Sequence, residues 1–118
     1  MWLGTSVEDQ SRAELRIPHL VDVPAHVHFL SCEPLLGPVD LTLWLGELHW
    51  VITGGESGPH ARPCDPAWVR SLRDQCQAAG VALVHKQNGG RTPKAGGRHL
   101  DGRTWDQFPA TGLEGSHA

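Results

Sequence analysis

Four short apolar runs in this chain each end in a cluster of polar residues. The runs cover residues 2–7, 27–32, 50–55 and 81–84. Glu8, Glu33 and Glu56 follow the first three runs, and Lys86 and Gln87 follow the fourth. Successive ends are separated by close to the ~30 residues of a strand-plus-crossover unit. This spacing predicts an α/β fold of parallel strands, whose carboxyl ends share the edge of the sheet where such proteins usually carry their chemistry.

The length of the chain limits how much of such a fold it can form. It has 118 residues, whereas a complete eight-unit β/α barrel needs ~250. We therefore predict a partial (half) β/α barrel of about four parallel βα units over residues 1–109, with 110–118 as a disordered tail. The net charge of -3 argues against a strongly basic nucleic-acid surface. Since no apolar run approaches the ~20 residues of a membrane span, we expect a cytoplasmic protein without a membrane partner.

Two helices are expected between the strands. Asp9 to Val21 carries an apolar face, and Pro18 within it should shorten or kink the helix. The second helix is expected from Asp65, its N-cap, to Gly80, its stop signal. Its apolar face comprises Trp68, Val69, Leu72, Cys76 and Ala79. Between the second and third runs, Leu41 to Leu45 has room for one or two helical turns.

Two further features complete the prediction of structure. The residues from Leu100 to Trp105 suggest a turn with a docked tryptophan. Cys32, Cys64 and Cys76 are widely spaced, which favours free thiols over a disulfide framework or a cysteine metal site. The histidines are scattered along the chain, so no metal site is predicted.

The glycine-rich turn after the third run is the strongest candidate site. Gly54 and Gly55 allow a ligand to approach the backbone and leave N–H groups free to hold an anion. Glu56 can accept hydrogen bonds from a ligand, Ser57 follows it, and Arg62 adds a charge partner. A tight turn whose glycines serve the backbone conformation alone explains the pattern equally well.

The second strand offers another candidate. Ser31 and Glu33 lie two residues apart and so on the same side of the strand, and Ser6 and Glu8 repeat this spacing on the first strand. Glu33 can serve as an acid, a base or a ligand anchor. Equally, it can form a salt bridge between neighbouring units.

Lys86 and Gln87 complete the row of strand ends. Lys86 can bind a carboxylate or phosphate, although a structural ion pair explains it nearly as well. The predicted catalytic residues are therefore Glu33, Glu56 and Lys86. The predicted binding residues are Ser6, Glu8, Ser31, Gly54, Gly55, Ser57, Arg62 and Gln87. A hydrolase with Glu33 or Glu56 as base is disfavoured, because no nucleophile–histidine pairing is visible.

A family resemblance is carried by several segments. They are WLGTSVE at 2–8, FLSCEPLLGP at 29–38, WVITGGESG at 50–58, ARP at 61–63, DPAWVR at 65–70 and LDGRTW at 100–105. Together they resemble the C-terminal half of a phage-related family of uncharacterised proteins. Members of that family look like radical S-adenosylmethionine enzymes, and their N-terminal half carries a cysteine triad that would hold a [4Fe–4S] cluster.

The chain also departs from the family pattern. The cysteine triad is absent, and Asn88 stands where the family usually has tryptophan, with aromatic residues expected at Val84 and His85. The resemblance implies that Ser6, Glu8, Ser31, Glu33 and the turn 54–57 line the cavity for cofactor and substrate.

The resemblance also implies a role for the chain within a larger enzyme. It would be the cofactor- and substrate-binding half, inactive alone, working with a missing N-terminal half or a second copy on an unknown small-molecule or macromolecular substrate. The chain alone would hold no cofactor, while S-adenosylmethionine and [4Fe-4S] would belong to a full-length relative. The alternative is a stand-alone small α/β ligand-binding protein that dimerises to cover its open sheet edges.

Overall fold

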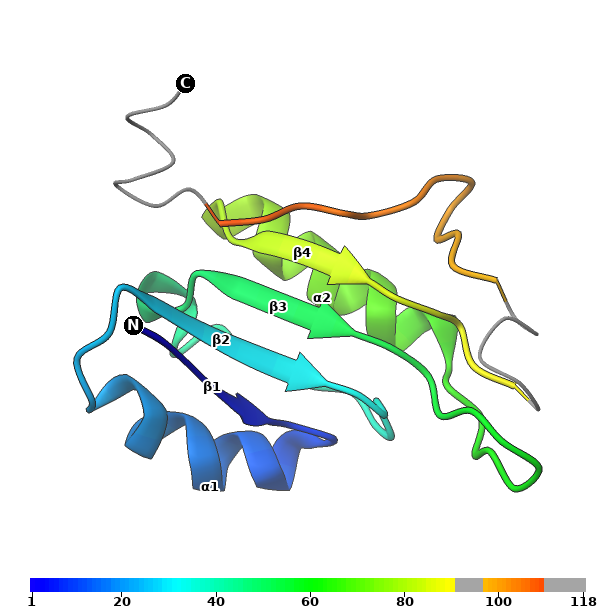
Figure 1. Cartoon of the computed structure of the whole chain (residues 1–118), viewed down its shortest axis with the longest axis horizontal. Helices are drawn as coiled ribbons and strands as arrows, with labels where there is room; N and C mark the ends of the chain where they lie inside the picture. Colours follow the sequence, from blue (N-terminus) through cyan, green and yellow to red (C-terminus); the bar gives the residue numbers. More distant parts are fainter. Residues whose placement is uncertain (91–96, 110–118) are drawn as a thin grey trace.

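The structure is a computed structural model, and it describes residues 1–90 and 97–109. The elements in chain order are β1 (Trp2–Ser6), α1 (Gln10–Val21), β2 (Val27–Cys32), the 3₁₀ helix η1 (Leu45–Glu47), β3 (Trp50–Thr53), α2 (Pro66–Ala79) and β4 (Ala82–His85) (Figure 1). All four strands are parallel, in the order β1-β2-β3-β4, so the predicted parallel α/β sheet is confirmed. The tail predicted at 110–118 lies outside the described residues. None of the described helices is long and apolar enough to cross a membrane.

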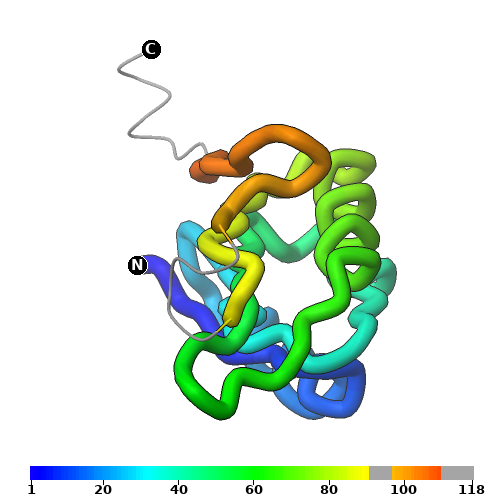
Figure 2. The backbone as a smooth tube through the Cα atoms, turned by 90° about the vertical axis from the view of Figure 1, so that its right-hand side faces the viewer, coloured from blue at the N-terminus to red at the C-terminus, as the bar shows by residue number. Residues whose placement is uncertain are grey.

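The register of the strands sorts their side chains onto two faces. One row of paired residues faces the helices and comprises Thr5, Leu30, Val51 and Leu83. The next row, on the opposite face, comprises Gly4, Phe29, Trp50 and Ala82. Ile17 of α1 and Leu72 of α2 belong to one hydrophobic cluster with Leu30, Val51 and Leu83. Both helices therefore cover the same face of the sheet, and no helix formed by residues 1–90 and 97–109 lies over the other face (Figure 2).

Helix α1 covers almost the whole of its predicted range. The Asp9 side chain caps it by accepting a hydrogen bond from the Arg12 backbone N–H at 3.0 Å. Pro18 lies inside the helix, which continues to Val21, so Pro18 does not shorten it, and the alternative that it kinks the helix stays a prediction. Proline removes the N–H that would bond to the Glu14 carbonyl. Because Pro18 and Glu14 are both exposed, water can hydrate that carbonyl.

The predicted limits of α2 are confirmed. The Asp65 side chain accepts a hydrogen bond from the Ala67 N–H at 2.9 Å, and Gly80 ends the helix at φ 74°. The predicted apolar face is buried at Val69, Leu72 and Cys76 and partly buried at Trp68. Ala79 is exposed, contrary to the prediction, because the last turn of the helix borders an open hollow.

The remaining connections contain no α-helix within the described residues, so α-helices follow β1 and β3 alone rather than all four strands. Between β2 and β3 the predicted helical turn is confirmed, since the Trp44 N–H donates to the Leu41 carbonyl at 2.8 Å. Gln75 of α2 holds this connection by accepting from the Leu41 N–H at 2.7 Å and donating to the Val39 carbonyl at 2.9 Å.

The segment 97–109 runs back along β4 and pairs with its outer edge. The His85 N–H donates to the Trp105 carbonyl, and the Gln107 N–H to the Leu83 carbonyl, both at 2.9 Å. Trp105 is buried, and its Nε1–H donates to the Leu100 carbonyl at 3.3 Å. The predicted turn with a docked tryptophan is therefore confirmed, and it closes one edge of the sheet.

Candidate functional site

The carboxyl ends of β2, β3 and β4 bring together Glu33, Gly54 and Lys86. These residues directly follow the paired residues Cys32, Thr53 and His85 in the register of the sheet. The Lys86 Nζ lies 3.3 Å from the Glu33 Oε1, so the two side chains meet across the middle strand. Gly54 makes room for this contact, because a Cβ there would lie 3.0 Å from the Glu33 Oε2. Two of the three predicted catalytic residues therefore form one site.

Hydroxyl groups lie one step further down the same face. Ser6 and Ser31 are paired in the register, and their row continues with Ile52 and Val84. The Ser31 hydroxyl donates to the Glu33 Oε1 at 3.5 Å. The candidate site thus has a charged pair at the edge, with serines on one side and apolar residues on the other.

Backbone hydrogen bonds to neighbouring segments hold the glycine-rich turn in place. The Gly54 N–H donates to the Cys32 carbonyl at 3.2 Å, the Gly55 N–H to the Gln87 carbonyl at 2.9 Å, and the Gly58 N–H to the Gly90 carbonyl at 3.0 Å. These amides are therefore not free to hold an anion, whereas binding of a ligand by close approach to Gly54 and Gly55 stays a prediction. A Cβ at Gly55 would lie 2.4 Å from the backbone oxygen of Asn88, so this glycine serves the close approach of two loops.

Two predicted binding residues take part in this junction of loops. The Gln87 Nε2 donates to the Gly55 carbonyl at 2.9 Å, so its amide group ties the end of β4 to the turn after β3. Ser57 is exposed and forms an isolated parallel bridge with Gly90. Both residues therefore belong to the loops beside the candidate site. Within residues 1–90 and 97–109, neither forms a hydrogen bond to Glu33 or Lys86.

Glu56 is held by the loop that follows it. Its Oε1 accepts from the Arg62 backbone N–H and the Arg62 Nε, both at 2.9 Å, and its Oε2 accepts from an Arg62 terminal nitrogen at 2.7 Å. The hydrogen bonds from Arg62 lower the pKa of Glu56 to about 2. A carboxylate with this many donors is a weak base, so its contacts support a role in closing the loop 56–62. Its predicted catalytic role stays a prediction.

Glu8 has a partner on α1. The Glu8 Oε2 lies 3.2 Å from a terminal nitrogen of Arg16, which also donates to the Ser6 carbonyl at 2.8 Å. The three glutamates at equivalent strand ends therefore have three different partners: a helix arginine, a lysine from another strand, and an arginine from the same loop.

A buried polar network beside the site was not predicted. The His85 ring is fully buried, with its Nδ1 2.9 Å from the Thr53 hydroxyl and its Nε2 2.7 Å from the Asn88 Oδ1. The Asn88 Nδ2 donates to the His99 carbonyl, so its Oδ1 accepts from the His85 Nε2–H and the Thr53 hydroxyl donates to the Nδ1. Burial lowers the pKa of His85, which keeps the ring neutral. The available signal was that both His85 and Asn88 depart from the family pattern.

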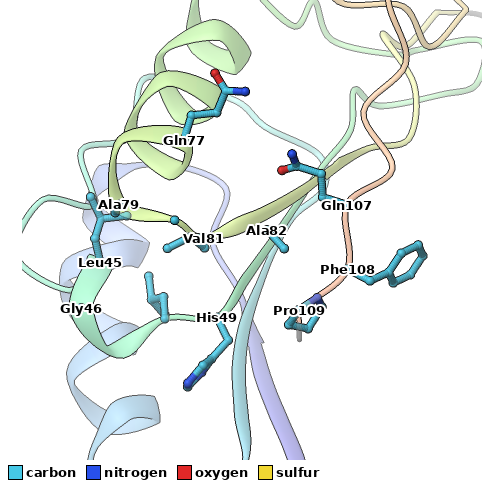
Figure 3. A pocket seen from close by; sticks show the side chains of 12 residues that line it. Leu45, Gly46, His49, Gln77, Ala79, Val81, Ala82, Gln107, Phe108 and Pro109 are labelled. Carbon is cyan, nitrogen blue, oxygen red and sulfur yellow. The ribbon is translucent and has the colours of Figure 1, made fainter. Parts of the chain in front are cut away.

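A large open hollow lies at the opposite end of β4. It has a volume of about 930 Å³ and lies between the end of α2, the start of β4 and residues 107–109 (Figure 3). Its polar lining comes from His49, Gln77 and Gln107, and none of the predicted site residues lines it. The candidate site remains at the carboxyl edge, because the carboxylate–ammonium pair lies there and the hollow is lined by no such pair.

The cysteines do not fit an iron–sulfur cluster. Such a cluster needs thiolate ligands. Cys32 and Cys76 are buried, Cys64 is partly buried, and all three are free thiols. Within residues 1–90 and 97–109, no three His, Cys, Asp or Glu side chains gather closely enough to hold a metal ion.

Fold and site together define an α/β protein with a short parallel sheet, helices on one face and a charged pair at its carboxyl edge. The sequence of this whole domain matches a known protein family. The chain belongs to the family described as Protein of unknown function (DUF5131), whose model matches residues 1–109. No curated protein and no solved structure matches the chain.

Proposed function

We propose that the chain is the ligand-binding half of a radical S-adenosylmethionine-like enzyme of phage-related origin, and that it binds its ligand at the Glu33–Lys86 pair. The observation that carries the proposal is the meeting of these two side chains across Gly54, at the carboxyl edge of the sheet. A carboxylate and an ammonium side by side complement a ligand that carries both groups, as the methionine part of S-adenosylmethionine does.

The other predicted residues support this site in different ways. Ser6 and Ser31 present hydroxyls beside the pair, while the Gln87 side chain and the Glu56–Arg62 pair fix the neighbouring loops. When bound, the cofactor would supply the radical. The iron–sulfur cluster that starts such a reaction would come from a partner carrying the N-terminal half, because the cysteines of this chain do not fit one. We place the protein in the cytoplasm, where free thiols persist.

One observation favours a second candidate function, a stand-alone small α/β ligand-binding protein. The segment from Trp105 to Gln107 pairs with the outer edge of β4. A further strand of a barrel cannot add at that edge while this pairing holds. The sheet is thus bounded at the β4 edge, as in an independent domain. The partial barrel therefore belongs to the first proposal alone.

Isothermal titration calorimetry with S-adenosylmethionine tests the proposed function. We expect the wild-type chain to bind it, and Glu33→Gln and Lys86→Met each to weaken binding at least tenfold, about 1.4 kcal/mol. Glu14→Gln is the matched control, because Glu14 is an exposed carboxylate on α1. Absence of binding, or binding that Glu33→Gln leaves unchanged, refutes the proposal. Binding of free methionine but not of S-adenosylmethionine, with the same response to the variants, supports the second candidate.

A further inference from the structure

The outer edge of β1 carries backbone groups that point away from the sheet. The Val7 N–H donates to the Ser31 carbonyl at 3.0 Å, and the Met1 carbonyl accepts from the His26 N–H at 2.9 Å. Because bonding alternates along a parallel strand, the odd-numbered residues of β1 bond to β2. The N–H and C=O groups of Trp2 and Gly4 and the N–H of Ser6 therefore face the open edge, next to α1 (Figure 1). The Ser6 carbonyl points the same way, and it accepts a hydrogen bond from a terminal nitrogen of Arg16 at 2.8 Å.

An apolar groove lies beside this edge, between β1 and α1. It has a volume of about 370 Å³, and Leu3, Leu15 and Leu20 supply its apolar lining. Leu15 is 65% exposed and lines the groove itself. Arg16 also lines the groove, and its charge is paired with Glu8 at 3.2 Å. The edge thus combines outward-facing strand groups, an apolar groove and an exposed apolar side chain.

We propose that the chain by itself forms a two-fold dimer in which β1 pairs antiparallel with β1 of a second copy, Gly4 opposite Gly4. Hydrogen-bonded pairs in an antiparallel ladder recur every two residues. With Gly4 on the axis, Trp2 lies opposite Ser6. The Gly4 groups and the Ser6 N–H then pair across the axis, while the Trp2 N–H of one copy competes with Arg16 for the Ser6 carbonyl of the other. This edge is therefore self-complementary, as a two-fold interface requires.

The same arrangement uses the groove. A two-fold axis perpendicular to the sheet keeps the helices of both copies on one side, so the two α1 helices lie next to each other. Leu15 of each copy is then placed beside the groove of the other. Burying two leucines and two apolar grooves stabilises the pair, while Arg16 adds no unpaired charge because Glu8 neutralises it.

The other edge of the sheet explains why the assembly stops at two copies. A head-to-tail arrangement would add β1 of one copy to β4 of the next. The pairing of residues 105–107 with β4 blocks that contact. A strand of another polypeptide would compete with the second copy for the β1 edge. The dimer does not depend on the proposed function, since it is expected whether or not the Glu33–Lys86 pair binds S-adenosylmethionine.

Sedimentation velocity of the full chain tests the proposal. We expect the mass of two 12.8 kDa chains at high micromolar concentration. Ser6→Pro removes an outward N–H without removing a bond to β2, and Leu15→Glu places a charge at the groove. Each should raise the dimer dissociation constant at least about tenfold. Leu43→Glu, at a leucine 86% exposed in another loop, should leave the dissociation constant unchanged.

Three results would overturn the proposal. They are a wild-type monomer at every concentration, a dimer that survives both Ser6→Pro and Leu15→Glu, and equal weakening by Leu43→Glu. Far-ultraviolet circular dichroism shows whether each variant is folded. If Ser6→Pro does not fold, Leu15→Glu decides alone, since its side chain is largely outside the core.

Discussion

Replacing Trp105 by alanine should detach the segment 97–109 from the domain. The indole is 4% exposed and packs within the main core cluster. Its Nε1–H donates to the Leu100 carbonyl, and the guanidinium carbons of Arg73 and Arg103 lie 5.6 and 4.0 Å from the ring centroid. Truncating a buried tryptophan to alanine costs ~3–5 kcal/mol. Because small domains are stable by ~5–15 kcal/mol, this is a large share of the free energy of unfolding.

Urea unfolding followed by circular dichroism measures that loss, and hydrogen exchange locates it. The amides of His85 and Gln107 should exchange faster in Trp105→Ala, since both bond across the edge that Trp105 holds in place. Phe108→Ala is the matched control, because Phe108 lies in the same segment and is 64% exposed. Its expected cost is below ~1 kcal/mol. A loss of less than 1 kcal/mol for Trp105→Ala, or unchanged exchange of both amides, would refute the reasoning.

Three further predictions test the loops and the buried network. Gly55→Ala should destabilise the fold by ~2–3 kcal/mol, because its Cβ would meet backbone atoms of Asn88, whereas Gly46→Ala, with open space around it, should cost under ~0.5 kcal/mol in the same urea assay. Arg62→Gln should raise the pKa of Glu56 from about 2 towards its ordinary value of 4.5, measured by carboxyl-carbon NMR titration; an unmoved pKa would contradict the pairing. Burial lowers the pKa of His85 below its ordinary value of 6.5, so the unfolded chain binds the proton more tightly. The stability from neutral His85 is therefore complete above that value and is lost as the pH falls through the folded-state pKa. His85→Gln should flatten this slope, and His19→Gln, at an exposed helix position, should not.

The strands and helix ends could be predicted because their signals are local. Asp65 and Gly80 mark the ends of α2 by their own backbone preferences, and the apolar runs place all four strands. Pro18 misled the prediction because the cost of a helix proline depends on whether the freed carbonyl is buried, which the sequence does not show. The amides of Gly54 and Gly55 misled it for the same reason, since their acceptors come from other strands and loops.

Ion pairs show the same limit. Arg62 could be predicted as a partner of Glu56, because the two residues share one short loop. The pairing of Glu33 with Lys86 needs the register of three strands and the missing side chain of Gly54 between them. Likewise, His85 and Asn88 stood out in the sequence as departures from a family pattern, yet their hydrogen bond became visible only when the chain after β4 was placed.

Equivalent positions at the strand ends do not give equivalent functions. A ligand at Glu56 would have to replace three hydrogen bonds from Arg62, which also close the loop. A ligand at Glu33 would have to replace one contact to Lys86 at 3.3 Å and one long hydrogen bond from the Ser31 hydroxyl at 3.5 Å. The two ion pairs are similarly exposed, with 57% and 24% for Lys86 and Glu33 against 61% and 25% for Arg62 and Glu56, so the number of hydrogen bonds decides between them. Of the three glutamates, Glu33 is therefore the one whose present partner a ligand can most readily displace.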